Sequence, residues 1–372
     1  MRPVAQDIPA IPAMQRSEPM PAAPPDAVDL RSDTVTRPTE AMYERMRRAR
    51  LGDDGLDGDP TARELEAVAA EALGKEAGLF VPSCTMANLI ATLCHVPRNQ
   101  QVVLEARAHM YTAERGAATF TGAFHVGIPG LDGAMDLGLL EEALRPSGSG
   151  LATGLIGLET SHNNAGGTVL PLAHMRAVQA MARGAGIPVH LDGARLLNAA
   201  VHLGVAPAEI AGLVDTVALC LSKGLSAPVG AVLAGSRHVV AQGRRLRRML
   251  GGAQRQVGIV AAAGLEAVQT MGPRLAEDHA RARLLGAGLN ALHPDLTASR
   301  PQTNIVQVDL SRTGHDSAHW LCALAEAGVL VRPLDRSHLR LVTHRHIDDA
   351  AIEAAIEGFR ICLERRVQSG PA

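Results

Sequence analysis

The sequence predicts an α/β fold, with a large, mainly parallel sheet covered by helices on both faces, followed by a small α+β domain. Two observations predict it. Short apolar runs alternate with helical stretches through the middle of the chain, which is typical of parallel sheets. Beyond Met271 the pattern changes to a helix, a strand, a second helix, two strands and a final helix. The 372 residues, 47% of them hydrophobic, can bury the cores of both units.

Three parts are expected along the chain. Residues 1–28 are rich in proline and alanine and lack apolar periodicity, which predicts a disordered N-terminal extension. Residues 29–275 should form the large domain, and residues 276–372 the small C-terminal domain.

The individual elements follow from local patterns. The first helix of the large domain should start after Asp59, where Thr61 and Glu64 have the spacing of a capping box. Apolar runs predict its strands at 102–104, 155–158, 189–191, 216–221 and 231–233. In the small domain we expect helices at 276–290, 316–327 and 347–366, and strands at 304–309, 329–332 and 339–342.

Composition excludes several classes of protein. A net charge of −2 and an aromatic content of 2% argue against nucleic-acid binding by base stacking. The five cysteines never form a C-x-x-C pair, which disfavours a disulfide framework and a zinc site, so no metal is expected. The chain has neither a membrane-length apolar run nor a signal peptide core. These features predict a cytoplasmic protein without a membrane partner.

Lysine usage singles out one candidate catalytic residue. Among 36 Lys and Arg residues only Lys75 and Lys223 are lysines, and Lys223 follows an apolar strand in a turn rich in Gly and Pro. Arginine stays charged, whereas a desolvated lysine can lose its proton and attack a carbonyl carbon. From placement alone, a lysine in an ion pair is an equally good interpretation.

Two further features become more specific when they are considered together with Lys223. Asp192 ends a predicted strand, where ligands bind in open α/β sheets, and its carboxylate could hold a pyridinium nitrogen. Residues 83–88 place small and hydroxyl side chains at a helix N-terminus, which suits a phosphate group. Taken separately, both features are better explained as helix caps. Together, in this chain order, a phosphate cradle, a strand-end acid and a lysine point to pyridoxal phosphate (PLP).

Five separated motifs carry a family resemblance. Residues 29–36, 190–195, 221–225, 250–256 and 340–344 resemble those of PLP-dependent L-threonine aldolases of the β-eliminating-lyase superfamily. The resemblance runs from Asp29 to the C-terminal helix. It implies the aspartate-aminotransferase type of fold (fold type I) and PLP as the cofactor.

The resemblance also implies roles for residues at the site. Lys223 would form a Schiff base with PLP, Asp192 would pair with the pyridine nitrogen, and His109 would stack over the ring. The phosphate would be held by Ser83, Cys84 and Thr85, and by Arg255 from a neighbouring subunit. Ser32, Arg195 and Arg340 would grip the substrate carboxylate, which suits planar guanidinium groups. A homo-oligomer with shared sites, a dimer of dimers, is therefore expected.

The expected reaction is cleavage of L-threonine, L-allo-threonine and related β-hydroxy-α-amino acids to glycine and an aldehyde. The base is left open between His109, His125 and an ordered water. Other PLP reactions on amino acids, namely β-elimination, racemisation and transamination, remain alternatives, as does a non-catalytic PLP-binding protein. Retention of the three carboxylate-binding residues argues against the last.

Some residues depart from the family pattern or invite other interpretations. Leu56 and Ala113 stand where the family has aromatic residues, and Cys84 replaces a glycine. We therefore hypothesise that bulky substrates such as phenylserine are accepted at least as well as threonine. His344 and His346 have the spacing of a metal pair, but no third ligand follows at an obvious spacing, which favours an ordinary loop.

Overall fold

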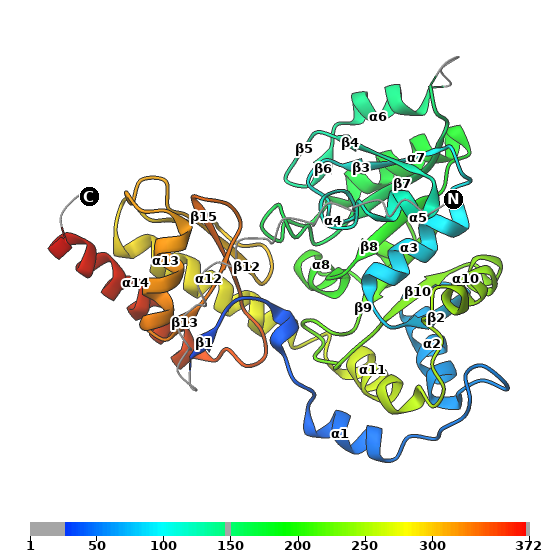
Figure 1. Ribbon diagram of the computed structural model, residues 1–372, viewed down its shortest axis with the longest axis horizontal. Helices are drawn as coiled ribbons and strands as arrows, with labels where there is room; N and C mark the ends of the chain where they lie inside the picture. Colours follow the sequence, from blue (N-terminus) through cyan, green and yellow to red (C-terminus); the bar gives the residue numbers. More distant parts are fainter. Residues whose placement is uncertain (1–26, 146–149, 370–372) are drawn as a thin grey trace, which may run out of the picture.

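A computed structural model describes residues 27–145 and 150–369 of the chain. The expected N-terminal extension, residues 1–28, lies outside the described residues except for Ala27 and Val28. Figure 1 shows a smaller C-terminal part, coloured yellow to red, beside a larger part that holds the central sheet.

The central sheet has seven strands, and six of them run parallel. Only β10 is antiparallel to both of its neighbours, β2 and β9. This arrangement confirms the predicted mainly parallel sheet, and every predicted strand of the large domain lies within or overlaps an observed strand. The spatial order is β2 (Ala77–Val81), β10 (Ala231–Gly235), β9 (Thr216–Cys220), β8 (Val189–Gly193), β7 (Thr153–Glu159), β3 (Gln101–Glu105) and β4 (Phe124–Ile128).

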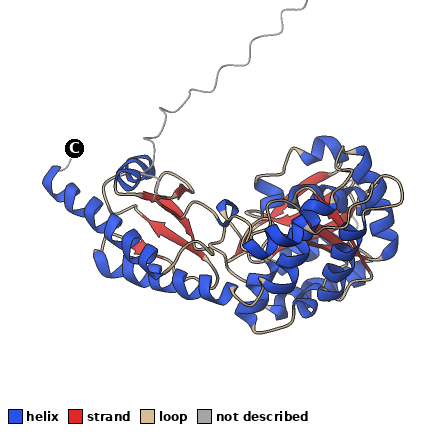
Figure 2. Ribbon diagram, turned by 90° about the horizontal axis from the view of Figure 1, so that it is seen from below, coloured by secondary structure: helices blue, strands red, loops and turns tan. Residues whose placement is uncertain are grey.

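Helices cover both faces of this sheet (Figure 2). Side chains alternate along each strand, so Leu79 and Leu233 enter one core while Phe80 and Val232 enter the other. The first face carries α3 (Cys84–His95) and α10 (Arg237–Met249), with the short helices α4 (His109–Thr112) and α5 (Ala117–Thr121) nearby. The second core takes in α2 (Pro60–Ala72), α6 (Leu137–Leu144), α7 (Leu172–Ala185), α8 (Leu196–Leu203), α9 (Pro207–Ala211) and α11 (Gly258–Thr270). Two smaller features complete this part, helix α1 (Glu40–Arg47), which packs on α11, and the hairpin β5 (Gly130–Leu131) and β6 (Ala134–Met135).

The C-terminal part has an antiparallel sheet and its own core. Trp320 and Phe359 pack in this core, and Leu30 from the N-terminal segment joins them. The division at residues 275 and 276 stays a prediction, which the separate core supports. The sheet order is β11 (Thr297–Ala298), β12 (Ile305–Asp309), β15 (His338–Val342) and β14 (Arg332–Pro333), and the helices are α12 (Leu275–Leu292), α13 (Ser317–Glu326) and α14 (Asp349–Ser369).

Two local predictions were wrong. Asp59, not Thr61, caps α2: its carboxylate accepts from the N–H of Ala62 at 2.9 Å, and Pro60 fills the first helical position. The expected strand 329–332 is divided, because β13 (Val329–Leu330) pairs in parallel with β1 (Val28–Asp29), whereas Arg332 begins β14.

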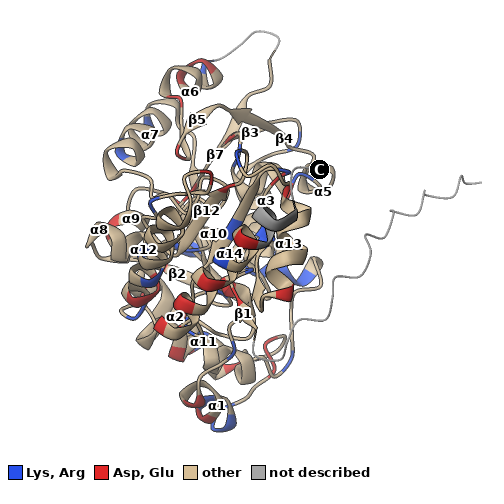
Figure 3. Cartoon of the chain, turned by 90° about the vertical axis from the view of Figure 1, so that its left-hand side faces the viewer, with Lys and Arg blue, Asp and Glu red and all other residues tan. Residues whose placement is uncertain are grey.

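Acidic and basic side chains are mixed over the helices. In Figure 3, α2 and α14 each carry both signs. The basic run 244–248 lies on α10, where Arg244 pairs with Glu66 at 2.6 Å and Arg247 pairs with Asp54. Among the described residues, no helix is both long enough and apolar enough to cross a bilayer.

Candidate active site

The turn after β9 fixes the backbone of Lys223. The carbonyl of Lys223 accepts from the N–H of Ser226 at 2.8 Å and from the hydroxyl of Thr36 at 2.8 Å. Ser226 adopts a φ of 64°, a left-handed conformation that the turn requires. Burial and the charge of Arg195 lower the pKa of the Lys223 amine, but Cys220 and the carboxylate of Asp192 nearby raise it overall. The amine therefore lies among ionisable groups of both signs rather than in a purely apolar setting.

Asp192 ends β8 as a buried hydrogen-bond acceptor. One carboxylate oxygen accepts from the N–H of Ala194 at 3.0 Å, and the other accepts from the amide of Asn88 at 3.0 Å. Arg195 is the N-cap residue of α8, so Asp192 does not cap that helix. Ligand atoms of Asp192 and His109 lie within 4.8 Å of one another, and the charge of Asp192 contributes to the raised pKa of Lys223.

His109 is held by a carboxylate that the sequence analysis missed. Its Nδ1 lies 2.9 Å from an oxygen of Glu114, whose side chain is only 7% exposed. The hydrogen bond to Glu114 is the largest cause that raises the pKa of His109, followed by the charges of Asp192, Glu114 and Glu159, against the opposing effect of burial. Glu114 follows His109 by five residues, across one short helix. This short separation in the sequence is the feature from which the contact could have been predicted.

The N-terminus of α3 faces the same group. Ser83 caps the helix by accepting from the N–H of Met86 at 3.2 Å, and this leaves the N–H groups of Cys84 and Thr85 at the free end. Such N–H groups and the helix dipole favour a phosphate. The hydroxyl of Thr85 donates to Glu114 at 3.1 Å and so links this end to His109.

Arg195 is committed to a buried ion pair. Its Nε and Nη2 atoms donate to the two carboxylate oxygens of Asp33, both at 2.8 Å. Burial would raise the pKa of Asp33, but the Arg195 guanidinium holds it well below its ordinary value. The expected grip of Arg195 on a substrate carboxylate is therefore restricted to its Nη1 atom.

Arg340 approaches the same point from β15. Its Nη1 donates to Asn163 Oδ1 at 2.8 Å, and Arg195 Nη1 lies 3.3 Å from that oxygen. The Nε of Arg340 is buried and has no hydrogen-bond partner among the described residues. Burial and the charge of Arg195 lower the pKa of Arg340 to about 10. Two guanidiniums that share one neutral amide oxygen, with a donor left over, suit a carboxylate ligand.

Three predicted residues make weaker or no contact with this group. Ser32 caps the short helix η1 (Asp33–Val35) and so lies directly beside Asp33. Both ring nitrogens of His125 are buried without a partner in the described chain, and burial lowers the pKa of this ring. Arg255 is 72% exposed and contacts Asp53 at 3.4 Å, so the structure does not bring it to Lys223 of the same chain.

A metal ion has one candidate set of ligands in the described residues. His109, Glu114 and Asp192 offer ligand atoms that lie within 4.8 Å of one another. The His109 ring already bonds to Glu114, and the amide of Asn88 lies between the two carboxylates. Two of these three side chains, His109 and Asp192, are those that the family resemblance assigns to the cofactor ring.

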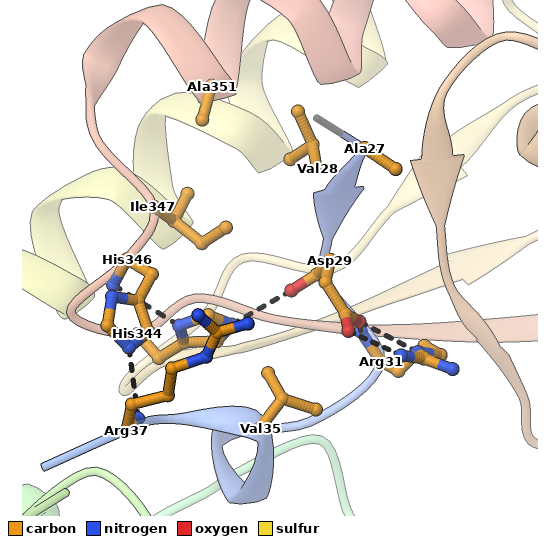
Figure 4. A pocket seen from close by; sticks show the side chains of 10 residues that line it. All are labelled: Ala27, Val28, Asp29, Arg31, Val35, Arg37, His344, His346, Ile347 and Ala351. Atoms are coloured by element: carbon orange, nitrogen blue, oxygen red, sulfur yellow. Dashed lines mark hydrogen bonds and ion pairs between the residues drawn. The ribbon is translucent and has the colours of Figure 1, made fainter. Parts of the chain in front are cut away.

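The pair His344 and His346 lines a separate cavity of about 530 Å³, shown in Figure 4. His344 uses both ring nitrogens, one with the carbonyl of Asp29 at 2.8 Å and one with the N–H of His346 at 3.3 Å. The Nε2 of His346 accepts from the N–H of Arg37 at 3.0 Å. These bonds support the interpretation of this motif as a structural loop rather than a metal pair.

The residues present fit PLP. A buried carboxylate at a strand end suits a protonated pyridine nitrogen, a free helix N-terminus suits its phosphate, and a lysine on the next strand suits its aldehyde. The partnerless Nε of Arg340 suits a substrate carboxylate beside it.

Comparisons with known proteins agree with this geometry. The family model for beta-eliminating lyases matches residues 29–313. The chain is 41% identical over 340 residues to the probable low-specificity L-threonine aldolase 2 of Arabidopsis thaliana, covering 89% of this chain and 96% of the relative. It is 37% identical over 344 residues to the low specificity L-threonine aldolase of Escherichia coli K12, covering 91% of this chain and all of the relative.

Solved structures share the fold. The threonine aldolase of Leishmania major superimposes with a TM-score of 0.77 at 20% identity, covering 91% of this chain and 99% of that one. A double mutant of Thermus thermophilus aspartate aminotransferase gives a TM-score of 0.70 at 20% identity, covering 90% and 91%. These similarities confirm the predicted fold type.

Proposed function

The chain belongs to the beta-eliminating lyase family, and we propose that it cleaves β-hydroxy-α-amino acids between Cα and Cβ to glycine and an aldehyde. It is a PLP-dependent carbon–carbon lyase of the threonine aldolase type, and L-threonine and L-allo-threonine are its expected substrates. The observation that carries the proposal is the convergence of two guanidiniums, Arg195 and Arg340, on one amide oxygen, that of Asn163. The charges of Arg195 and Asp192 both act on the pKa of Lys223.

The residues of the candidate site have distinct tasks in this reaction. Bound PLP supplies an electron sink for the pair released from the cleaved Cα–Cβ bond. Lys223 would hold the cofactor aldehyde, and Asp192 would accept a hydrogen bond from the pyridine nitrogen and so favour its protonated form. Arg340 and the Nη1 of Arg195, the guanidinium nitrogen that does not bond to Asp33, would bind the substrate carboxylate and thereby orient the bond that breaks.

His109 is the base that the structure favours. Its Nδ1 is occupied by Glu114, which leaves Nε2 to take the proton from the substrate β-hydroxyl. A carboxylate at Nδ1 fixes the tautomer and raises basicity, as in other oriented histidine bases. His125 has no such partner, and burial lowers its pKa.

The site is shared between subunits of a homo-oligomer in this proposal, with a dimer of dimers as the expected assembly. The exposed Arg255 pairs with Asp53 in its own chain, which supports a role for its guanidinium at the phosphate site of a second copy. Exposed apolar side chains close in sequence to Arg255 or to its contact Asp53 support such a contact, namely Leu51, Leu56, Met249 and Ile259. A cytoplasmic location stays a prediction.

The proposed substrate range depends on two positions that depart from the family pattern. Leu56 and Ala113 are both solvent-exposed, and neither offers the aromatic surface expected from the family pattern. We infer that a bulky β-substituent such as the phenyl ring of phenylserine is accepted at least as well as the methyl group of threonine.

Product analysis tests the reaction class. Purified enzyme with PLP and L-threonine should release glycine and acetaldehyde in equal amounts. 2-Oxobutanoate with ammonia from L-threonine, or pyruvate with ammonia from L-serine, would support elimination. An exchanged α-proton without cleavage would support racemisation, and a keto acid with pyridoxamine phosphate would support transamination. The absence of any product would favour a non-catalytic PLP-binding protein.

A further inference from the structure

We propose that Asn88 is a positioning residue for the cofactor site, because a buried chain of hydrogen bonds fixes its amide so that it donates to both site carboxylates, Asp192 and Glu114. The proposal rests on the assignment of Asp192 to the cofactor nitrogen in the proposed function. It adds a structural cause for the position and hydrogen bonding of that carboxylate. The cause is a chain of hydrogen bonds that runs from Asp192 to His95 at the far end of α3.

Both the nitrogen and the oxygen of the Asn88 side-chain amide are hydrogen-bonded. Asn88 lies on α3 and is 1% exposed. Its Nδ2 donates to Asp192 at 3.0 Å and to the two oxygens of Glu114 at 3.3 and 3.4 Å. Its Oδ1 lies 3.0 Å from Nε2 of the buried His190. One amide therefore bridges two carboxylates and one imidazole.

The positions of the protons follow from these partners. Carboxylate oxygens accept, so the Nδ2 atom of Asn88 must face them and the Oδ1 atom must face His190. Burial lowers the pKa of His190 to about 3, so the ring is neutral and carries one proton. That proton must lie on Nε2, because two acceptors would otherwise face each other at 3.0 Å.

The chain continues to the C-terminal end of α3. With its proton on Nε2, His190 accepts at Nδ1 from the hydroxyl of Thr216, 2.9 Å away. The oxygen of Thr216 then accepts from Nε2 of His95, 3.2 Å away, the last residue of α3. Every donor points toward Asp192 and Glu114, and aligned hydrogen bonds of this kind polarise one another in the same direction.

The opposite arrangement would have a chemical cost at the site. If His190 carried its proton on Nδ1, Asn88 would have to turn its oxygen toward Asp192, and that carboxylate would lose its side-chain donor. An amide oxygen facing the Asp192 carboxylate would repel it and would leave one carboxylate oxygen without its side-chain donor, which would disturb the position of Asp192 beside the pyridine nitrogen. The tautomer of His190 is thus tied to the function of Asp192.

The first test reads the tautomer directly. Nitrogen-15 NMR of the full-length protein, without PLP, should show His190 neutral near pH 7 with its proton on Nε2. A proton on Nδ1, or a doubly protonated ring, would overturn the proposal. This measurement does not depend on aldolase activity, so it stands or fails separately from the proposed reaction.

The second test uses a matched pair of substitutions. Thr216→Val removes a hydroxyl from the chain, whereas Thr92→Val removes an equally buried hydroxyl of α3 that bonds only to the backbone carbonyl of Asn88. Thr216→Val should mix the His190 tautomers and weaken PLP binding roughly fivefold, and Asn88→Leu should weaken it by about 10²-fold. Thr92→Val should leave both readouts near wild type. Equal PLP dissociation constants for the two valine variants would contradict the proposal.

Discussion

The two sides of the candidate site are built differently. On the substrate-carboxylate side, Asp33 and Arg195 are 0% and 3% exposed and form a two-bonded ion pair within one chain. On the phosphate side, α3 offers free N–H groups, but Arg255 is 72% exposed and points to Asp53 instead. In the proposed function, one chain completes the first side, whereas the second side takes Arg255 from a partner chain. Under that proposal the fixed ion pair lies where the substrate is oriented, and assembly completes cofactor binding.

Breaking the ion pair on the substrate-carboxylate side should have the largest effect on stability. Asp33→Asn leaves the Arg195 guanidinium buried without its counter-charge, so stability should fall by about 3–5 kcal/mol. The exposed pair of Asp29 with Arg31 is the control, and Asp29→Asn should cost about 0–1 kcal/mol. Urea unfolding of both variants measures the difference. Equal losses would show that the Asp33 pair has no special role.

The pH dependence of this effect has a definite sign. The native pKa of Asp33 lies below its unfolded value, so the pair stabilises the protein above about pH 4 and its contribution is lost as the pH falls further. Asp33→Asn should remove this acid-sensitive part. An unchanged slope of stability against pH below pH 4 in the variant would argue against it.

Removing the guanidinium of Arg255 from the phosphate side should weaken cofactor binding without unfolding the chain. Arg255→Met should raise the PLP dissociation constant roughly 10- to 100-fold, the value of a charge-assisted bond to phosphate. Its stability should be near wild type, because the side chain is exposed.

A mixing experiment sharpens this prediction. Inactive Lys223→Ala and impaired Arg255→Met chains, unfolded together and refolded, should regain about a quarter of wild-type activity if each site joins two chains. A mixture no more active than the sum of its parts would place Arg255 and Lys223 in the same chain.

A smaller effect is expected where the two sides meet. Glu114 bonds both His109 and Thr85, so Glu114→Gln should lower the pKa of His109. Because the neutral ring acts as base, the acid limb of the kcat profile should move to lower pH, and kcat itself should fall about tenfold. His125→Asn is the comparison and should leave the limb in place. A limb that moves with His125 instead would reassign the base.

The smallest effect concerns substrate range. Steady-state kinetics on L-threonine and phenylserine should give kcat/KM values that favour phenylserine or are equal. A preference for threonine of about tenfold or more would refute the proposed wide pocket. Leu56→Tyr should shift the ratio toward threonine if the exposed loop enters the site of a neighbouring chain.

Sequence patterns predicted the parts of the site that lie at strand ends and helix starts. Lys223, Asp192 and Ser83 each occupy such a position, where local pattern and chemistry agree. The contact of Asp33 with Arg195 joins residues 162 positions apart, and that of Asn88 with Asp192 joins residues 104 apart. No local periodicity encodes these pairs.

The same limit applies to the fold. The apolar runs predicted most of the parallel sheet, but β1 and β13 form a two-residue pairing between opposite ends of the chain. The prediction of the α2 cap was wrong for a local reason. Asp59 followed by Pro60 is a stronger helix start than Thr61, so the helix begins one residue after Asp59.

The composition of the chain allows a direct test of the central claim, that Lys223 holds PLP. Only two lysines exist, and Lys75 donates to the carbonyl of Val214 at 2.5 Å, away from the site. Borohydride reduction of the PLP-loaded enzyme followed by peptide mass spectrometry should find the pyridoxyl group on Lys223 alone. Attachment to Lys75, or to neither lysine while PLP remains bound, would contradict the account.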